Sequence, residues 1–390
     1  MTIYKAPGVY VEDVLSGARP IEAVGTSVAA ILGNAPKADH RKGEPIAINS
    51  YLEFRREFLP QEADGAKPVS NILANAVSGF FSNGGRRCYV VNLGKGAASI
   101  TDKHLEPLDV HEDISLLVAP GFSDVSSHDV MIGACENRGD RMAILDTARK
   151  IDPLAQFAKS ALGEGAQKGL HPPEAERGHA CVFTPWIKVR DVLTGDANVE
   201  QPPSGHLAGL FGLTDARRGV HKAPANMVLQ GATGLTRWIT ETEQGQLNPL
   251  GINCIRMFHD GIKVWGSRTL AKAESDMRYI PVRRLVIMVS QSVKRGTRWV
   301  VFEPNDETLW KSIRRDVGAF LNTLWRSGAL MGATANEAYF VKCDAETTTQ
   351  ADIDAGRVIA HIGLATVKPA EFVILRLGQS VEQQKVEEEA

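Results

Sequence analysis

The chain has 390 residues, 43% of them hydrophobic and 23% charged, which is the composition of a folded protein with a substantial core, and its length predicts two or three domains. A formal net charge of −2 argues against an overall basic surface for nucleic acid. No run of about 18 apolar residues predicts a membrane span, and the N-terminal stretch lacks the charged and apolar regions of a secretory signal.

The five cysteines are far apart in the sequence and form no CxxC pair. This spacing argues against a zinc site or a disulfide framework, and it predicts buried free thiols. We therefore expect a protein that is made in a reducing cytoplasm or is indifferent to redox state. The cysteines are Cys88, Cys135, Cys181, Cys254 and Cys343.

The first predicted element is a strand within YKAPGVYVEDV, residues 4–14. Val9 and Val11 alternate with Tyr10 and Glu12, which is the spacing of a strand. No partner strand is evident nearby, and an unpaired strand exposes a row of backbone hydrogen-bonding groups. The sequence therefore predicts an N-terminal arm over residues 1–20.

Residues 21–105 are predicted to form a small α/β part. The apolar run at 26–33 and the run at 88–93 indicate buried strands. Between them, Ser50 and Glu53 have the spacing of a capping box and predict a helix, and residues 70–85 predict a second one.

Residues 106–270 predict a central domain in which strands alternate with helices. Strands are expected at 114–120, 142–146 and 179–189, and helices before residue 137, at 152–162 and from 201. This alternation is typical of a mostly parallel, covered sheet. A hairpin is predicted over 252–270, with Asp260-Gly261 at its turn.

Residues 271–380 predict an α+β C-terminal domain, followed by an acidic tail at 381–390. Helices are expected at 281–295 and, capped by Asn305, at 305–328. Strands are expected at 298–304, 339–343, 357–367 and 371–379. The fold class predicted for the whole chain is α/β (mixed α+β), with extended N- and C-terminal strand arms.

Motifs for catalysis were not found in the sequence. The segment GKGAAS at 94–99 does not fit the phosphate-binding pattern GxxxxGK[ST], and no HExxH or GxSxG motif occurs. Serine, histidine and aspartate occur in every region, so a catalytic triad can be assembled only by chance combinations. We expect no catalytic residue, no cofactor and no metal.

One patterned group of charges lies on the predicted 305–328 helix. Four basic side chains gather on the face opposite its apolar stripe, namely Lys311, Arg314, Arg315 and Arg326. This face is either simply solvated or a docking strip for an acidic partner surface. The 281–295 helix carries a competing group made of Arg283, Arg284, Lys294 and Arg295.

The sequence resembles the contractile tail sheath proteins of phages and of phage-tail-like contractile injection systems. The segments that carry the resemblance follow the family's order over nearly the whole chain, and no large inserted domain interrupts them. They include APGVYVEDV, RPIEAVGTSVAAILG, VAPGFSD, GDRMAILD, PPSGHLAG, RGVHKAPAN, GINCIR, GIKVWGSRTL, RYIPVRRL, WVVFEPND, LWKSIRRDVGAFL and KPAEFVILRLGQ.

The resemblance implies a structural subunit that forms hexameric rings, stacked as a six-start helix around an inner tube. It implies contraction from a metastable extended state, which drives the tube through a target envelope. The implied partners are further copies of the chain, the inner tube protein, and baseplate and terminator or cap proteins, without direct nucleic-acid contact or membrane insertion. Assembly in the bacterial cytoplasm, as part of a virion tail or of a particle that can be released, is also implied.

Two sets of residues acquire expected roles from this resemblance. The terminal strands are expected to join sheets of neighbouring subunits by β-augmentation. Their residues are Val9, Tyr10, Val11, Glu12, Val14, Phe372, Val373, Ile374 and Leu375. Lys311, Arg314, Arg315 and Arg326 are expected to contact the inner tube.

Two other classes of protein remain as alternatives. The alternating central region and its many Asp, His and Ser residues also fit a soluble α/β hydrolase, which needs no terminal arms. A non-contractile filament or shell protein is the third possibility. Oligomer size separates the hydrolase from a sheath, and only two observed lattice states separate a sheath from a static filament.

Overall fold

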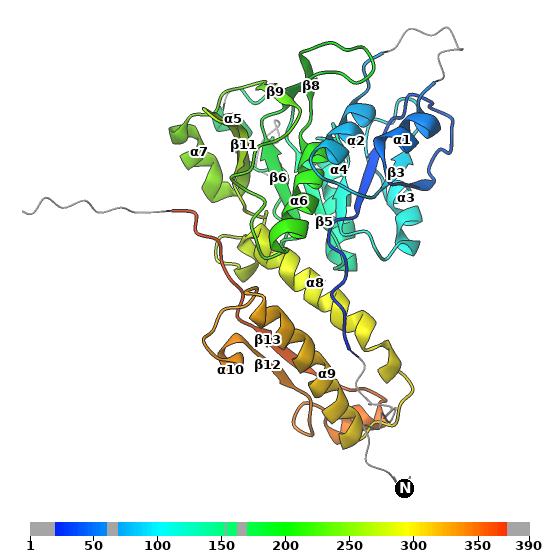
Figure 1. Ribbon diagram of the computed structural model, residues 1–390, viewed down its shortest axis with the longest axis vertical. Helices are drawn as coiled ribbons and strands as arrows, with labels where there is room; N and C mark the ends of the chain where they lie inside the picture. The colour runs from blue at the N-terminus through cyan, green and yellow to red at the C-terminus, as the bar shows by residue number, and fades with distance from the viewer. Residues whose placement is uncertain (1–19, 61–68, 153, 162–169, 373–390) are drawn as a thin grey trace, which may run out of the picture.

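The computed structural model describes residues 20–60, 69–152, 154–161 and 170–372. It contains an eight-stranded sheet covered by helices and, beside this body, an elongated C-terminal part built on two long helices (Figure 1). The mixed architecture with a mostly parallel sheet confirms the predicted fold class.

The large sheet has the strand order β11-β10-β6-β5-β4-β1-β3-β2. Neighbours from β10 to β3 are parallel, and the edge strands β11 and β2 are antiparallel. The strands are β1 (Ala29–Gly33), β2 (Pro45–Ile48), β3 (Cys88–Asn92), β4 (Leu116–Val118), β5 (Met142–Asp146), β6 (Ala180–Thr184), β10 (Ile252–Phe258) and β11 (Gly261–Trp265). The segments 21–105 and 106–270 thus contribute to one continuous sheet.

The central strands are buried along their whole length, because helices cover both faces of the sheet. Ala29 and Ile31 of β1 belong to one apolar core, and Ala30 and Leu32 to the core on the opposite face. The first core is closed mainly by α1, α2 and α6, and the second by α4 with side chains of α5 and α7. The helices are α1 (Tyr51–Phe58), α2 (Ile72–Ser82), α3 (Asp102–Leu105), α4 (Val125–Arg138), α5 (Leu154–Phe157), α6 (Ser204–Arg218) and α7 (Glu241–Leu247).

Helices α2 and α6 approach each other closely because glycines lie at their contact. A Cβ atom at Gly205 would be 2.7 Å from the Cβ of Ala76, and one at Gly209 would overlap the carbonyl oxygen of Phe80. Gly79 likewise leaves room for the ring of His206. The close packing of α2 against α6 therefore depends on glycine at these three positions.

A small sheet lies at one end of the central body, with the strand order β8-β7-β9. Its strands are β7 (Ile187–Val189), β8 (Val199–Gln201) and β9 (Ala232–Leu235). Short 3₁₀ helices occur at η2 (Glu106–Val110), η3 (Asn248–Leu250), η4 (Asp276–Arg278) and η5 (Arg298–Val300).

The C-terminal part has its own apolar core between α8, α9 and a two-stranded sheet. Leu285 and Val289 of α8 contribute to it together with Val317 and Leu321 of α9. The elements are α8 (Ile280–Gly296), α9 (Glu307–Arg326), α10 (Ala335–Ala338), β12 (Tyr339–Lys342), α11 (Gln350–Asp354) and β13 (His361–Leu364). Among the described residues, no helix is long and apolar enough to cross a bilayer.

The predicted strand at 298–304 was wrong. Residues 298–300 form η5 and the chain then turns, with Phe302 at a φ of 71°. Val301 and Phe302 are exposed, at 62% and 102% of their reference areas. The apolar composition of this segment indicated a strand, but it connects two long helices and has no neighbouring strand to pair with in the described part of the chain.

Other boundaries also differ from the predictions. The helix expected at 152–162 is described only over Leu154–Phe157, and the strand expected at 179–189 is divided at Pro185, which has no N–H to donate to a ladder. Asp306, not Asn305, caps α9, because its carboxylate accepts the Leu309 N–H at 2.8 Å.

The predictions for the hairpin and for the last strand have different outcomes. The hairpin is present, but its two-residue loop is His259-Asp260 and not the predicted Asp260-Gly261, because Gly261 pairs with Phe258. The strand expected at 371–379 falls almost entirely outside the described residues, and the two described residues, Glu371 and Phe372, are not in a strand.

Candidate functional site

The joint between the central body and the C-terminal part is centred on Arg284 of α8. This side chain is 4% exposed, and its guanidinium donates to both carboxylate oxygens of Asp215, at 2.8 and 2.5 Å. It also donates to the carbonyl oxygen of Thr26, whose hydroxyl donates to Asp215. The guanidinium lies over the ring of Phe211, 5.1 Å from its centroid. Three segments far apart in the sequence are thereby held together by one buried ion pair.

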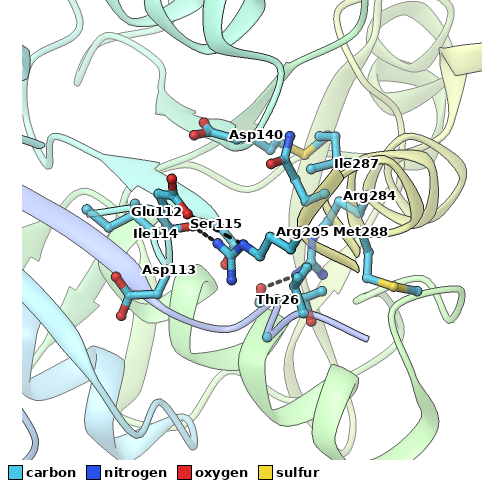
Figure 2. A pocket seen from close by; sticks show the side chains of 14 residues that line it. Thr26, Glu112, Asp113, Ile114, Ser115, Asp140, Arg284, Ile287, Met288 and Arg295 are labelled. Atoms are coloured by element: carbon cyan, nitrogen blue, oxygen red, sulfur yellow. Dashed lines mark hydrogen bonds and ion pairs between the residues drawn. The ribbon is translucent and has the colours of Figure 1, made fainter. Parts of the chain in front are cut away.

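Beside this ion pair lies a small cavity between α8 and the edge of the central body (Figure 2). Thr26, Ser115 and Met288 are among its lining residues. Its volume is about 20 Å³, which is room for one water molecule. The cavity is therefore a packing gap at the joint and too small for a ligand.

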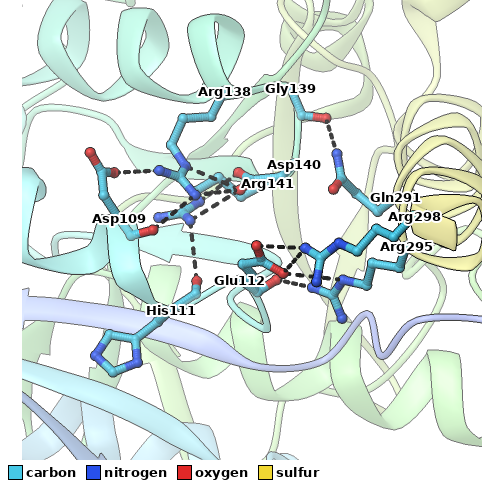
Figure 3. A network of polar contacts seen from close by, with 10 residues as sticks. All are labelled: Asp109, His111, Glu112, Arg138, Gly139, Asp140, Arg141, Gln291, Arg295 and Arg298. Carbon is cyan, nitrogen blue, oxygen red and sulfur yellow. Dashed lines mark hydrogen bonds and ion pairs between the residues drawn. The ribbon is translucent and has the colours of Figure 1, made fainter. Parts of the chain in front are cut away.

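A second set of contacts continues the joint toward the end of α8 (Figure 3). Arg298 donates to both carboxylate oxygens of Glu112, at 2.7 and 2.6 Å, and Arg295 donates to the Glu112 backbone oxygen. The Arg298 hydrogen bond is the main reason that the pKa of Glu112 is below its usual value. Because these groups are exposed, salt screens them, and they add orientation more than stability.

Next to these contacts, an aspartate of the central body binds two arginines. Asp140 accepts hydrogen bonds from Arg138 and Arg141, and this pairing offsets burial so that the pKa of Asp140 is lowered. On α8, Gln291 reaches the carbonyl oxygen of Gly139 at 3.4 Å. The joint is thus made from short-range polar contacts along much of one face of α8.

Most of the basic residues predicted as a group on α8 make contacts inside the subunit. Arg283 donates to His179, and burial followed by the charge of Arg283 lowers the pKa of this histidine to about 3. Arg283, Arg284 and Arg295 therefore all bind within the chain, whereas Lys294 is exposed and has no hydrogen bond or ion pair with another described residue. The competing basic group on 281–295 is thus largely used inside the subunit.

Most of the basic strip predicted on α9 is exposed. Lys311 and Arg315 are 61% and 49% exposed, and the carboxylates that they bind, those of Glu307 and Asp316, belong to the same helix. Arg326 is exposed at the end of the helix. Arg314 departs from the strip, since it donates to the carbonyl oxygen of Cys343 and is partly buried. The outward-facing strip therefore consists of Lys311, Arg315 and Arg326.

Of the nine residues predicted for the terminal arms, one lies in the described part of the chain. Val9, Tyr10, Val11, Glu12 and Val14 lie outside the described residues, as do Val373, Ile374 and Leu375. Phe372 is described and is 74% exposed. The residue before it, Glu371, is anchored by Arg268 at 2.5 Å. The chain is thus fixed to the body immediately before the predicted C-terminal arm.

A two-stranded sheet in the C-terminal part offers a place for additional strands. In the described part of the chain β12 pairs only with β13, so each strand has one edge without a strand partner. Helix α9 packs against β12, and Phe340 of β12 is 58% exposed. Open edges of this kind can accept a strand from another chain.

A serine, an aspartate and a histidine do meet at the carboxyl end of β5. Ser204 donates to Asp146 at 2.6 Å, and His128 lies nearby, but all three are at most 2% exposed. Burial raises the pKa of Asp146 to about 7 and lowers that of His128 to about 4. The aspartate binds the serine directly, so this arrangement ties the start of α6 to the sheet and gives no substrate access. All five cysteines are free and buried, as predicted.

The described residues thus contain a buried ion pair at the joint, an open two-stranded sheet, and a Ser-Asp-His group that is closed to solvent. Two family models match the chain: the phage tail sheath protein central domain over residues 111–270 and the phage tail sheath C-terminal domain over residues 272–379. The chain belongs to the phage tail sheath family, whose members are structural proteins and not enzymes.

Individual relatives agree with this assignment. A Pseudomonas aeruginosa protein described as a putative prophage major tail sheath protein is 27% identical over 262 residues, which are 66% of this chain and 62% of that protein. The chain thus matches about three fifths of this curated relative's length. Among solved structures, the sheath complex of an extracellular contractile injection system (PVC) in the contracted state has a TM-score of 0.78 and 32% identity, over 98% of this chain and 99% of that one. A chain of the anti-feeding prophage baseplate, 6-fold symmetrised, has a TM-score of 0.73 and 33% identity, over 97% and 100%.

The sequence alone could not identify the joint. It placed Arg284 in an exposed basic group, whereas the structure buries it against Asp215, 69 residues away. The available signal was the position of Arg284 between Ile280 and Met288, four residues from each, on the apolar side of the helix.

Proposed function

We propose that this protein is the subunit of a contractile sheath, which assembles around an inner tube and drives that tube through a target envelope when it contracts. The observation that carries the proposal is the likeness, at 32% identity over almost the whole of both chains, to a sheath described in a contracted state. The 6-fold symmetry stated for the similar baseplate structure supports hexameric rings stacked as a six-start helix, and association with a baseplate.

The open two-stranded sheet supports a way for the subunits to connect. The arm strands around residues 9–14 and 372–375 would add to the edges of β12 and β13 in neighbouring copies, so that backbone hydrogen bonds link the lattice. Such a head-to-tail contact is heterologous and naturally builds rings and helices. One strand is a weak tether, but many act together in a closed lattice.

Removal of residues 1–14 is expected to abolish sheath formation while leaving the subunit folded. The full chain, expressed alone and viewed by negative-stain electron microscopy, should form hollow ridged cylinders, and the truncated chain should remain as small particles. A matched control keeps the length and composition of the arm but shuffles residues 4–14, which destroys the strand alternation, and it should fail in the same way. Cylinders formed by the truncated chain, with an unchanged thermal unfolding midpoint, would contradict the arm proposal.

The exposed basic strip of α9 supports contact with an acidic inner tube. Lys311, Arg315 and Arg326 would hold the sheath in its extended state, so that their loss lowers the barrier to contraction. Combined replacement of these three residues by glutamate is expected to give contracted sheath without extended sheath when the tube protein is co-expressed. The same charge change at Arg55, Arg56 and Lys103, which are exposed on other helices, is the control. Normal extended particles from the α9 variant would exclude this role.

The remaining details follow from the same proposal. The subunit would assemble in the bacterial cytoplasm as part of a virion tail or of a phage-tail-like particle, with terminator or cap proteins at its end. The arm, the N-terminal α/β part, the central domain, the C-terminal domain and the acidic tail would be divided at residues 20, 105, 270 and 380.

A further inference from the structure

A large groove lies beside the root of the predicted C-terminal arm. Its volume is about 1080 Å³, and its walls come from several segments that are separate in the sequence. These are the end of α6 with the loop that follows it, helix α7 with η3, Arg256 of β10, the end of β11 with the loop that follows it, and residues 367–372. Figure 1 shows the last of these segments, in red, leaving the C-terminal part on the side of the molecule where α7 lies.

The groove carries an excess of positive charge. Five lysines and arginines line it against two glutamates, and one of these, Glu371, is already bound to Arg268. Among the described residues Arg218, Lys222 and Arg256 have no acidic partner. Lys222 donates only to the carbonyl oxygen of Ala223, and Arg256 donates to Gln244.

The positive charge of Arg218 acts on two neighbouring side chains of the groove. Burial, followed by the nearby charge of Arg218, lowers the pKa of Lys222 and likewise that of His221. An anion that enters the groove beside Arg218 and Lys222 would be attracted by both charges. Trp265 and the exposed Phe372 add apolar surface at the rim. The groove therefore fits an extended acidic peptide better than a small ion.

The chain itself supplies such a peptide. Beyond Phe372, the last described residue, 18 residues follow, which reach about 60 Å when extended. Four of them are glutamates, at positions 382, 387, 388 and 389, and they outnumber the two basic residues, Arg376 and Lys385. Because this segment is tethered at the rim of the groove, its local concentration there is far above that of any free peptide.

We propose that the acidic segment 382–389 binds in the basic groove of its own chain, with its glutamates against Arg218, Lys222 and Arg256. In the sheath proposed above, this contact would keep the C-terminal arm beside its own subunit before assembly. That consequence rests on the proposed function, whereas the binding itself is tested without assembly.

The test uses full chain from the fraction that sediments as single subunits, separated from any cylinders, and a labelled peptide of residues 380–390, with binding followed by fluorescence anisotropy. In one variant of the full chain all four tail glutamates are replaced by glutamine, which frees the groove. The peptide is expected to bind this variant at low salt, to bind the native chain at least tenfold more weakly because its own tail competes, and to lose affinity as salt is raised.

Two controls identify the groove as the binding site. Adding R218E, K222E and R256E to the neutral-tail variant should weaken peptide binding at least tenfold, whereas R55E, R56E and K103E should not. A peptide with its four glutamates replaced by glutamine should also bind at least tenfold more weakly. No binding, or binding that is insensitive to the groove substitutions, would overturn the proposal. Equal binding to the native and neutral-tail chains would overturn occupancy by the chain's own tail.

Discussion

Replacing Asp215 by alanine is expected to destabilise the subunit by about 3–5 kcal/mol, the range found when one partner of a buried ion pair is removed. The large effect arises because Arg284 would keep its charge at 4% exposure and lose both carboxylate contacts. The carbonyl oxygen of Thr26 would remain its main hydrogen-bond acceptor. Denaturant unfolding of the unassembled subunit measures this difference directly.

Two further variants separate the ion pair from its surroundings. D276A removes an aspartate that is 86% exposed and 3.3 Å from Lys368, and this change should cost less than about 0.5 kcal/mol. The double variant D215L/R284M replaces both charges with apolar groups beside Phe211 and should recover most of the lost stability. A D215A variant as stable as the native chain would show that the joint does not depend on this pair.

Replacing Gly209 by alanine is expected to cost roughly 3 kcal/mol, at the upper end of the usual range for overpacking. The new methyl group would overlap the carbonyl oxygen of Phe80, which is part of the backbone of α2 and cannot rotate away. The two helices would have to separate, and both lie against the buried strands of the sheet. The measurement is the thermal or denaturant midpoint of the subunit.

Gly133 on α4 is the matched control for this substitution. It also lies inside a helix, but no heavy atom lies within 4 Å of the position that a Cβ atom would take there. G133A should therefore stabilise the protein by about 0.5–1 kcal/mol, the usual gain of alanine over glycine in a helix. If G209A lowers the free energy of unfolding and G133A raises it, the steric contact with Phe80, and not helix propensity, determines the effect at Gly209. A change of the same sign in both variants would contradict this explanation.

Local patterns predicted much of the fold. The strand at 142–146 agrees with β5 residue for residue, and the helix at 281–295 differs from α8 by one residue at each end. In both cases the apolar spacing and the flanking residues define the element without reference to the rest of the chain. The parallel sheet could likewise be inferred from the alternation of strands and helices.

Long-range contacts could not be predicted in this way. Residues 298–304 have the composition of a strand, but composition does not say whether a partner strand is available, and here none is in the described structure. The pairing of Arg284 with Asp215 depends on how α8 meets α6, and the basic groove combines several segments that are separate in the sequence. Helical spacing identifies the basic face of α9, yet Arg314 leaves this face to bind the carbonyl oxygen of Cys343, the residue after β12.

The open sheet of the C-terminal part has a thermodynamic consequence. A two-stranded sheet is marginal by itself, and here it depends on α9 for burial of one face. A strand donated by a neighbour, as proposed, binds the folded sheet and not the unfolded chain, so it acts on this part as a stabilising ligand does. The free energy of unfolding of the C-terminal part then rises with subunit concentration by mass action, and folding of that part and growth of the lattice become one coupled equilibrium.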